Sequence, residues 1–479
     1  MVIIANKITS ITLNTTEGCS LRCKYCFADI NAGKKEGRNL SSETMKKVID
    51  WLFADSTSGT ATELGTTSLG ISFWGGEPFH NWPILKEAVL YANELSNSTG
   101  KKVNFSAATN MIELNKEKLD FIKKHKIGLT LSHDGIKEVH DSQRVFPDGR
   151  GSFDVLDSRL EDILENLDLQ SAGIRLTITP KSIPYLYKSY EYFISKGFTR
   201  LHHCFAYEDN YSEDLLKEYK NQLIKIGKRC FIENRRGNEY EDKLLKDYLK
   251  LVEYLHKNNL DITNITAEQE TQINKQFNFL RPCSCGLMFY SVSVEGAMFI
   301  CHRFDKHGLD TPIENRPGFC GFIGDPLIIS KELESIKSWD YSKEEKCKAC
   351  PARFICRGGC FAAKYDMLGN VNDPLDAICA EHVATYEAAV EVYKLYTDTG
   401  LELSSKDLMF NKNTNLNTIT QCTCNGTYVF PNYIGSNTED YKNFDMTVLG
   451  MAQQVIDKYY RKELDKEVMS EREVVTTCK

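Results

Sequence analysis

"ITSITLNTTEGCSLRCKYCFA", residues 8–28, joins a β-rich run to a loop that carries three cysteines within eight positions. Cys19, Cys23 and Cys26 are one ligand short of the four that tetrahedral zinc and complete iron-sulfur cubes normally take. A four-iron cube held by three thiolates keeps one iron without a protein ligand, much as catalytic metal sites keep an open position. The spacing therefore favours an open metal site directly after the first strand.

Length and composition limit the class of protein. At 479 residues the chain is long enough for two or three folded units with a large core. Its 42% hydrophobic and 26% charged residues are typical of a soluble globular protein. The net charge of −7 leaves no excess of positive charge for phosphate contacts, so we expect no nucleic-acid partner. No signal peptide or long apolar run is present, so we expect a cytoplasmic protein without a membrane partner.

The 17 cysteines are concentrated in two places. Three lie at 19–26 and nine lie between 283 and 379, whereas the region between them has only Cys204 and Cys230. In a reducing cytosol such a density indicates metal binding before it indicates a disulfide framework. Cys204 and Cys230 are predicted to be ordinary buried thiols.

Strand and helix signals alternate along the first 206 residues. Helices are predicted at 41–53, with Ser41 or Ser42 as the cap, and at 82–95. Strands are predicted at 8–16, 68–74, 103–109, 127–132, 173–179 and 200–206. This alternation predicts an α/β fold with a parallel sheet and crossover helices. Ligands of such folds gather at the carboxyl ends of the strands, where the segments TTEGC, WGGEP, ATNM and SHDG are expected to converge.

The pattern Cys19-x3-Cys23-x2-Cys26, with Tyr25 before the last cysteine, resembles the signature of the radical S-adenosylmethionine (SAM) superfamily. The resemblance implies a partial (β/α)6 TIM-like barrel, a [4Fe-4S] cluster on the three cysteines and S-adenosylmethionine as cofactor. "GGEP" at 75–78 is similar to the segment with which this family meets the amino group of the cofactor. Gly75 and Gly76 allow close approach of a ligand, and the Glu77 carboxylate can pair with an ammonium.

Further cofactor contacts follow from the same resemblance. In "SHDGIKEVHDSQR", the serine and the arginine twelve positions later correspond to residues that bind the cofactor in close relatives. An arginine suits its carboxylate because the guanidinium is a planar fork. Thr109 and Asn110 are candidates for polar support or a simple turn. The cofactor-binding residues implied by the resemblance are Tyr25, Gly75, Gly76, Glu77, Ser132, Arg144 and, as an adenine contact or a core residue, Phe205.

A second cysteine pattern begins at Cys285 and resembles the SPASM extension of some radical SAM enzymes, which carries two auxiliary [4Fe-4S] clusters. The resemblance implies three clusters in all. The second auxiliary cluster would be held by Cys347, Cys350, Cys356 and Cys379. The first would be held by Cys285, Cys301 and Cys360, with a fourth ligand from Cys283, from Cys320 or from a substrate thiolate. Of these three we favour Cys283.

Four regions are expected along the chain. They are a radical SAM partial barrel at 1–206, a helical bridge at 207–280, a SPASM domain at 281–380 and a C-terminal helical and irregular extension at 381–479. Helices are predicted at 380–398 and 448–467, and no role is assigned to Cys422, Cys424 and Cys478. Only 18 residues precede Cys19, so we expect the tail, the bridge or a separate protein to recognise any leader peptide.

The resemblance implies a radical SAM enzyme that abstracts hydrogen from a ribosomally made peptide, giving a thioether or carbon crosslink or an epimer. The expected partners are a short precursor peptide and an electron donor such as a flavodoxin or ferredoxin. Anaerobic sulfatase maturases resemble this chain, but they carry an aspartate where "CHRFD" has His302. His302 is a candidate catalytic base or a structural residue. Formylglycine formation, small-molecule chemistry and a non-catalytic iron-sulfur electron carrier stay as alternatives.

Overall fold

The computed structural model of the chain describes residues 8–28, 37–55, 68–167, 171–235, 240–277, 282–287, 289–306 and 311–399. The predicted helix at 448–467 and the thiols of Cys422, Cys424 and Cys478 lie outside the described residues. Among the helices that are described, none has the length and apolarity that a membrane crossing requires.

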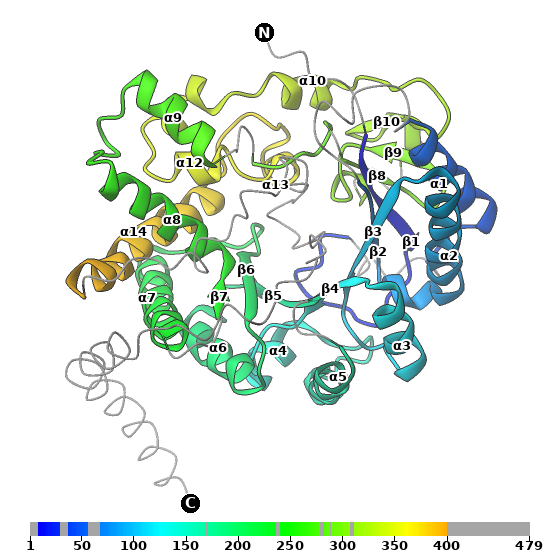
Figure 1. Cartoon of the computed structure of the whole chain (residues 1–479), viewed down its shortest axis with the longest axis horizontal. Coiled ribbons are helices and arrows are strands. Elements are labelled where there is room, and N and C mark those ends of the chain that lie inside the picture. The colour runs from blue at the N-terminus through cyan, green and yellow to red at the C-terminus, as the bar shows by residue number, and fades with distance from the viewer. Residues whose placement is uncertain are drawn as a thin grey trace, which may run out of the picture.

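Ten strands in the described residues form one sheet, in the order β10-β9-β8-β1-β2-β3-β4-β5-β6-β7 (Figure 1). Their bounds are β1 Ser10–Thr16, β2 Ser68–Gly75, β3 Lys102–Thr109, β4 Gly128–Ser132, β5 Ala172–Ile178, β6 Arg200–Phe205, β7 Glu241–Asp242, β8 Phe289–Val292, β9 Ala297–Phe299 and β10 Phe319–Phe322. Strands β1 to β7 pair in parallel. The six predicted strands are confirmed as β1 to β6, and the α/β fold class is confirmed with them.

Helices connect the parallel strands and surround the outside of the curved sheet (Figure 1). In the barrel they are α1 Ser42–Asp55, α2 Trp82–Thr99, α3 Lys116–His125, α4 Lys137–Gln143, α5 Phe153–Asn166 and α6 Leu186–Ser195. Those that follow are α7 Glu213–Arg235, α8 Lys243–Lys257, α9 Ala267–Phe277, α10 Lys331–Ser338, α11 Glu345–Lys348, α12 Arg353–Cys356, α13 Phe361–Leu368 and α14 Asp376–Asp398. The predicted helices at 41–53, 82–95 and 380–398 are confirmed as α1, α2 and α14.

Local chemistry explains where several helices begin. Ser41 is the cap of α1, because its hydroxyl accepts a hydrogen bond from the Thr44 N–H at 3.0 Å. Asn115 and Asp242 cap α3 and α8 in the same way. Each cap satisfies a backbone donor that has no partner inside its helix, so the turn from strand to helix is fixed by residues close in sequence.

The cysteine-rich region is built onto the barrel rather than set apart from it. Strand β8 pairs in parallel with β1, and β9 and β10 continue the sheet in antiparallel order. All seven residues of β1 are buried, since the strand has a neighbour on both sides. The sequence predicts a loop-dominated region here, and these three strands are the difference. The proposed boundaries of the four regions stay a prediction. Strands β8 to β10 of the predicted SPASM domain belong to the same sheet as the barrel strands.

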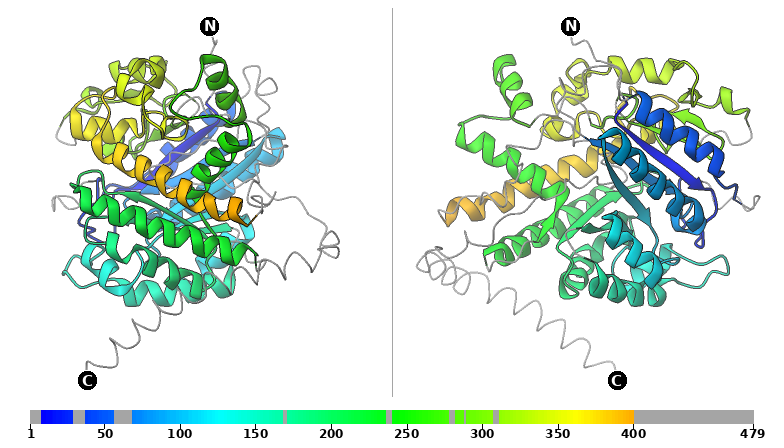
Figure 2. Two further views of the ribbon diagram at one scale, coloured as in Figure 1. Left: turned by 90° about the vertical axis from the view of Figure 1, so that its left-hand side faces the viewer. Right: turned by 45° about the vertical axis from the view of Figure 1, so that its right-hand side comes forward.

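Helix α14 connects the two parts of the molecule. It packs along α7 and α8 on the barrel side, as the two views of Figure 2 show. Its Glu381 carboxylate accepts hydrogen bonds from the Phe205 N–H at 2.8 Å and from the Tyr207 hydroxyl at 3.1 Å. Its first turn carries Cys379 of the second cysteine pattern. The cysteine-rich region is therefore anchored to the end of β6 as well as to β1.

Candidate functional site

The three-cysteine loop is folded against the segment that follows α4. The Arg22 N–H donates to the Val145 carbonyl at 2.7 Å, and the Cys26 N–H donates to the Cys23 carbonyl at 3.1 Å. Cys23 and Cys26 both raise the pKa of Cys19, so the three thiols lie within electrostatic range of one another. The loop thus gathers the predicted cluster ligands at the carboxyl end of β1.

The surroundings of Cys19 suit a metal-bound thiolate. Its sulfur accepts hydrogen bonds from the Leu21 N–H and from Asn110 Nδ2, each at 3.4 Å. Burial raises the pKa values of Cys19 and Cys23 to about 12, so both thiols are protonated until a metal displaces the proton. Donors to sulfur stabilise the thiolate that results. These residues therefore fit an iron-sulfur cluster. Asn110, predicted as polar support or a turn, contacts Cys19, one of the predicted cluster ligands.

Compact single-ion sites are a different matter. No three His, Cys, Asp or Glu side chains in the described part of the chain are grouped so as to hold one metal ion. None of the cysteines in that part forms a disulfide. A zinc ion draws its sulfurs to within about 4 Å of each other, because each Zn–S bond is about 2.3 Å. In a four-iron cube each thiolate ligates a different iron, so the sulfurs stand wider apart.

Gly75 and Gly76 bring the second strand end against the three-cysteine loop. The Gly76 N–H donates to the Thr16 carbonyl and the Glu77 N–H donates to the Gly18 carbonyl, both at 2.8 Å. A Cβ on Gly75 would lie 2.1 Å from the Thr16 carbonyl oxygen, and one on Gly76 would lie 2.2 Å from that of Gly18. Gly75 also has φ +144°, which disfavours any other residue. The two glycines are required for this approach.

Glu77 is buried and organises the ends of β2 and β3. Its carboxylate accepts hydrogen bonds from the Asn110 N–H at 2.7 Å, the Thr109 hydroxyl at 2.8 Å and the Phe79 N–H at 3.2 Å. Burial raises the pKa of Glu77 to about 7 although these donors lower it. The carboxylate is therefore committed to holding two loops together beside Cys19, and an additional cation there would favour its charged form.

Asp134 is a site residue that the sequence analysis missed. Its carboxylate lies 3.0 Å from both Nε and Nη2 of Arg144, and it accepts hydrogen bonds from the Tyr25 hydroxyl and from the Thr177 N–H. The Arg144 guanidinium also lies over the Tyr25 ring, 5.3 Å from its centroid. The available signal was an acidic residue within the quoted SHDG segment. The resemblance places Arg144 at the cofactor carboxylate. In the structure Asp134 holds the Arg144 guanidinium next to Cys23, and the charge of Arg144 lowers the pKa of Cys23.

The other predicted cofactor contacts differ in exposure. Ser132 is partly exposed at the carboxyl end of β4, on the same side as the three-cysteine loop. Phe205 is buried at the end of β6, where its ring stacks on Tyr211 at 4.0 Å and meets Tyr219 edge-on at 4.8 Å. Of the two roles that the sequence leaves open for Phe205, this packing is that of a core residue. The contact with adenine stays a prediction.

His302 is fully buried among aromatic rings at the junction of the two cysteine regions. Its ring centroid lies 4.5 Å from that of Trp74 and 6.3 Å from those of Phe27 and Phe289. Trp74 immediately precedes Gly75. His302 therefore lies close to the predicted cofactor site, between β2 and β8, in a setting that also suits the structural role.

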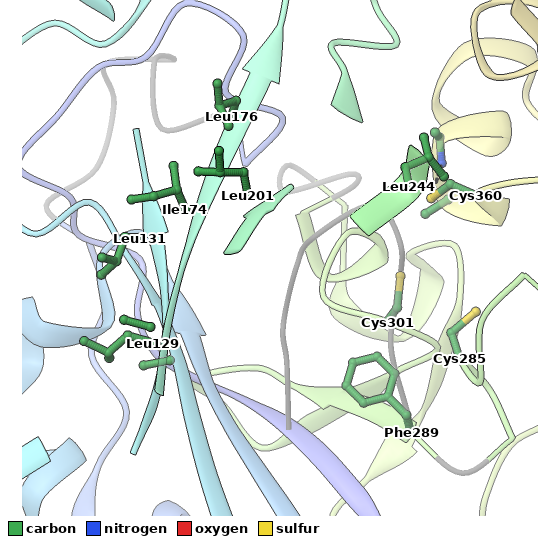
Figure 3. Packing of buried hydrophobic residues seen from close by; sticks show 14 of the residues in the cluster. Leu129, Leu131, Ile174, Leu176, Leu201, Leu244, Cys285, Phe289, Cys301 and Cys360 are labelled. Carbon is green, nitrogen blue, oxygen red and sulfur yellow. Dashed lines mark hydrogen bonds between the residues drawn. The ribbon is translucent and has the colours of Figure 1, made fainter. Parts of the chain in front are cut away.

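Four cysteines of the second region form one group, named here the first thiol group: Cys283, Cys285, Cys301 and Cys360. The sulfurs of Cys283 and Cys285 are 3.1 Å apart, and Cys283, Cys301 and Cys360 all raise the pKa of Cys285. Figure 3 shows Cys285 and Cys301 near Phe289, and Cys360 farther from that ring, beside Leu244. The thiol of Cys320 instead donates to the Gly318 carbonyl at 3.3 Å. Burial raises the pKa of Cys320, and the charged groups that act on it are Lys337 and Glu332 rather than the first thiol group.

The remaining cysteines of the SPASM-like pattern form the second thiol group: Cys347, Cys350, Cys356 and Cys379. Cys379, Cys350 and Cys347 all raise the pKa of Cys356, so the four lie within range of one another. They come from α11, from the turn after it, from α12 and from the first turn of α14. The eight thiols thus lie in two groups, and their assignment to two auxiliary clusters stays a prediction.

Comparison with known proteins identifies the barrel. The model of the "Radical SAM superfamily" matches residues 13–185. The uncharacterized protein MJ0907 of Methanocaldococcus jannaschii is 28% identical over 217 residues, which cover 45% of this chain and 65% of that protein. The cysteine-type anaerobic sulfatase-maturating enzyme of Clostridium perfringens strain 13 is 23% identical over 358 residues, covering 72% of this chain and 86% of the enzyme.

Solved structures show the same fold. The structure titled native anSMEcpe with bound AdoMet superposes with a TM-score of 0.61 at 19% identity, covering 81% of this chain and 99% of that one. Another, with AdoMet and the Kp18Cys peptide, gives a TM-score of 0.60. Residues 13–185 therefore form a radical SAM domain, and the chain is similar in sequence and in fold to the anaerobic sulfatase maturases.

Proposed function

We propose that this enzyme modifies a ribosomally made peptide by abstracting a hydrogen atom from a C–H bond, giving a thioether or carbon crosslink or an epimer. The observation that carries the proposal is the meeting of the three-cysteine loop with Glu77, Asn110 and the Asp134–Arg144 pair at one end of the sheet. When bound there, a reduced four-iron cluster supplies the electron that splits S-adenosylmethionine into methionine and a 5'-deoxyadenosyl radical.

In this proposal Cys19, Cys23 and Cys26 hold the cluster as thiolates and leave one iron open for the cofactor. Glu77 keeps the β2 and β3 loops in place, and Asp134 fixes the guanidinium of Arg144 beside the cluster loop. A buried, oriented guanidinium is well suited to a carboxylate such as that of the methionine moiety. The remaining cofactor contacts in the proposal are Tyr25, Gly75, Gly76, Ser132 and Phe205.

Two auxiliary [4Fe-4S] clusters complete the proposal, within the SPASM region at 281–380. The first thiol group would hold one of them, with Cys283 as the fourth ligand. Cys283 lies within electrostatic range of Cys285, Cys301 and Cys360, which supports that choice over Cys320, whose thiol is bonded to Gly318. The second thiol group would hold the other. With four protein thiolates each, the auxiliary clusters have no open iron, which suits electron transfer rather than substrate ligation.

A peptide is the substrate that the relatives support. A solved anSMEcpe structure holds the Kp18Cys peptide. The fold of anSMEcpe matches 81% of the present chain. We propose a short precursor peptide as substrate and a flavodoxin or ferredoxin as electron donor. The acidic chain, with a net charge of −7, offers no general attraction for nucleic acid.

Formylglycine formation is the second candidate, because the cysteine-type sulfatase-maturating enzyme aligns over 72% of the chain. His302 stands where those maturases, by the sequence resemblance, carry an aspartate. A histidine that takes a proton there would serve a different oxidation or crosslinking step. Mass spectrometry distinguishes the two candidates, since formylglycine, a crosslink and an epimer give different mass changes or none.

The test is anaerobic reconstitution of the full chain followed by reduction in the presence of S-adenosylmethionine and peptides encoded beside the gene. We expect 5'-deoxyadenosine to form and its yield to rise with the peptide that is modified. A fully reconstituted chain that forms no 5'-deoxyadenosine would instead be an iron-sulfur electron carrier.

The role of His302 has its own test. His302→Ala is expected to stop product formation while 5'-deoxyadenosine still forms, because removal of a base uncouples cofactor cleavage from the later proton transfer. Unchanged turnover would assign the residue to packing between Trp74 and Phe289.

A further inference from the structure

Lys364 lies in the first turn of α13 and is 0% exposed. Its backbone N–H donates to the Cys360 carbonyl at 3.1 Å, which fixes the start of its side chain next to the first thiol group. Within the described residues, its ammonium nitrogen is buried and has no hydrogen-bond partner. Lysine is rarely fully buried without a partner, so this side chain requires an explanation.

The surroundings of the ammonium are aromatic rings and sulfur. Its nitrogen lies 4.0 Å from the centroid of the Trp339 ring and 5.6 Å from that of Phe361. Trp339 is held in place because its indole N–H donates to the Arg357 carbonyl at 3.0 Å. The largest electrostatic contributions at Lys364 come from four thiols, one of the first thiol group and three of the second: Cys360, Cys347, Cys356 and Cys379.

Arg303 provides a contrast in the same part of the molecule. It is also buried and also acts electrostatically on Cys360. Its guanidinium, however, is paired with two carboxylates, Asp366 at 2.5 Å and Glu208. The positive charge of Arg303 is thus neutralised by protein groups, whereas Lys364, in the part of the chain that the structure describes, is surrounded by rings and thiols.

A buried ammonium costs several kcal/mol unless an anion compensates it. Two aromatic rings compensate only part of that cost. Neutral thiols accept hydrogen bonds weakly, but thiolates that ligate a cluster carry negative charge. The position of Lys364 is therefore favourable only when negative charge resides on the two thiol groups.

We propose that Lys364 is a shared counter-ion of the two auxiliary clusters and raises their reduction potentials. The inference rests on the proposed function, since it presupposes that both thiol groups hold clusters. Reduction adds one negative charge to a cluster, and a nearby cation stabilises the reduced form more than the oxidised form. Three of the four neighbouring thiols belong to the second thiol group, so the cluster there is affected more.

The test compares variants of the full chain in which Cys19, Cys23 and Cys26 are all replaced by Ala, so that only auxiliary clusters are present. Lys364→Met removes the charge, Lys364→Arg keeps it, and Lys343→Met is the control because its side chain is 77% exposed. Iron is measured chemically, and midpoint potentials come from redox titration followed by electron paramagnetic resonance. We expect Lys364→Met to lower the potential of at least one cluster while the other two variants match the parent.

Each outcome separates the inference from the proposed function. A parent with far fewer than about eight irons per chain would contradict the auxiliary clusters themselves, and the inference with them. Full iron content with an unchanged potential in Lys364→Met overturns the counter-ion alone. Loss of iron in Lys364→Met that Lys364→Arg prevents supports it, because arginine retains the charge. Equal loss in both variants overturns it, because the residue then acts only through packing.

Discussion

The two cysteine regions neutralise their buried charges in different ways. Beside the three-cysteine loop, Glu77 accepts three hydrogen bonds and Arg144 is paired with Asp134. In the SPASM-like region Arg303 is likewise paired, with Asp366 and Glu208, but Lys364 has no such acceptor among the described residues. The first site is therefore arranged by strand ends and their side chains, whereas the second depends on what its thiols bind.

The secondary structure that carries the cysteines also differs between the two regions. The first site lies at the ends of β1 to β4, which are held by parallel pairing, and β1 is buried along its whole length. The second thiol group is carried by α11 and α12, each of four residues, and by the start of α14. Short helices contribute little stability of their own. Metal ligation is expected to stabilise the second region more than the first.

The largest expected effect separates the two regions by function. Cys23→Ala should abolish formation of 5'-deoxyadenosine, because the open cluster loses one of its three ligands. The auxiliary clusters should keep their iron and their spectra. Cys230→Ala, near the C-terminal end of α7, is the control and should retain activity. Loss of iron from all clusters in Cys23→Ala would show that the regions do not assemble independently.

The next effect tests the same separation from the other side. Cys356→Ala should remove about a third of the iron, one cluster of three, and leave cleavage of S-adenosylmethionine by the first site. Product formation should fall because the route for the substrate electron is broken. Iron analysis and the yields of 5'-deoxyadenosine and product are the measurements. A variant that loses cofactor cleavage as well would mean that the second region supports the first.

A smaller effect addresses the paired charges of the first site. Asp134→Ala should lower the free energy of unfolding by about 3–5 kcal/mol, because it leaves a buried guanidinium without its partner. The matched control is Asp148→Ala, which removes the exposed pair with Arg150 and should leave the free energy of unfolding nearly unchanged. Urea denaturation of both variants checks the prediction, and equal shifts would contradict a preformed first site.

The smallest effect concerns the helix that joins the regions. His382 on α14 is buried and hydrogen-bonded to the Tyr248 hydroxyl at 2.7 Å, and burial lowers its pKa to about 4. The folded state therefore takes up this proton at a lower pH than the unfolded state does. The contribution of neutral His382 to the free energy of unfolding is fully present above pH 6.5 and is lost as the pH falls.

For His382 the change to test is His382→Gln, at equal cluster loading. Between pH 7.5 and 5.5 the parent should lose about 1 kcal/mol of unfolding free energy more than the variant. Taking the difference between the two chains removes the contribution of the other buried histidines. Identical slopes with pH would show that this histidine does not couple the joining helix to acid.

The sequence by itself determined the local features. Strand periodicity located β1 to β6, and cysteine spacing alone divided the thiols into one set of three and a later dense set, because both signals involve residues close in the chain. Only the tertiary structure decided which residues meet across it. The pairing of β8 with β1 joins segments far apart in sequence, and the salt bridge between Asp134 and Arg144 and the burial of Lys364 beside four thiols depend on side-chain directions that residue spacing does not give. Such contacts depend on how the sheet closes and what it buries, and no short pattern encodes that.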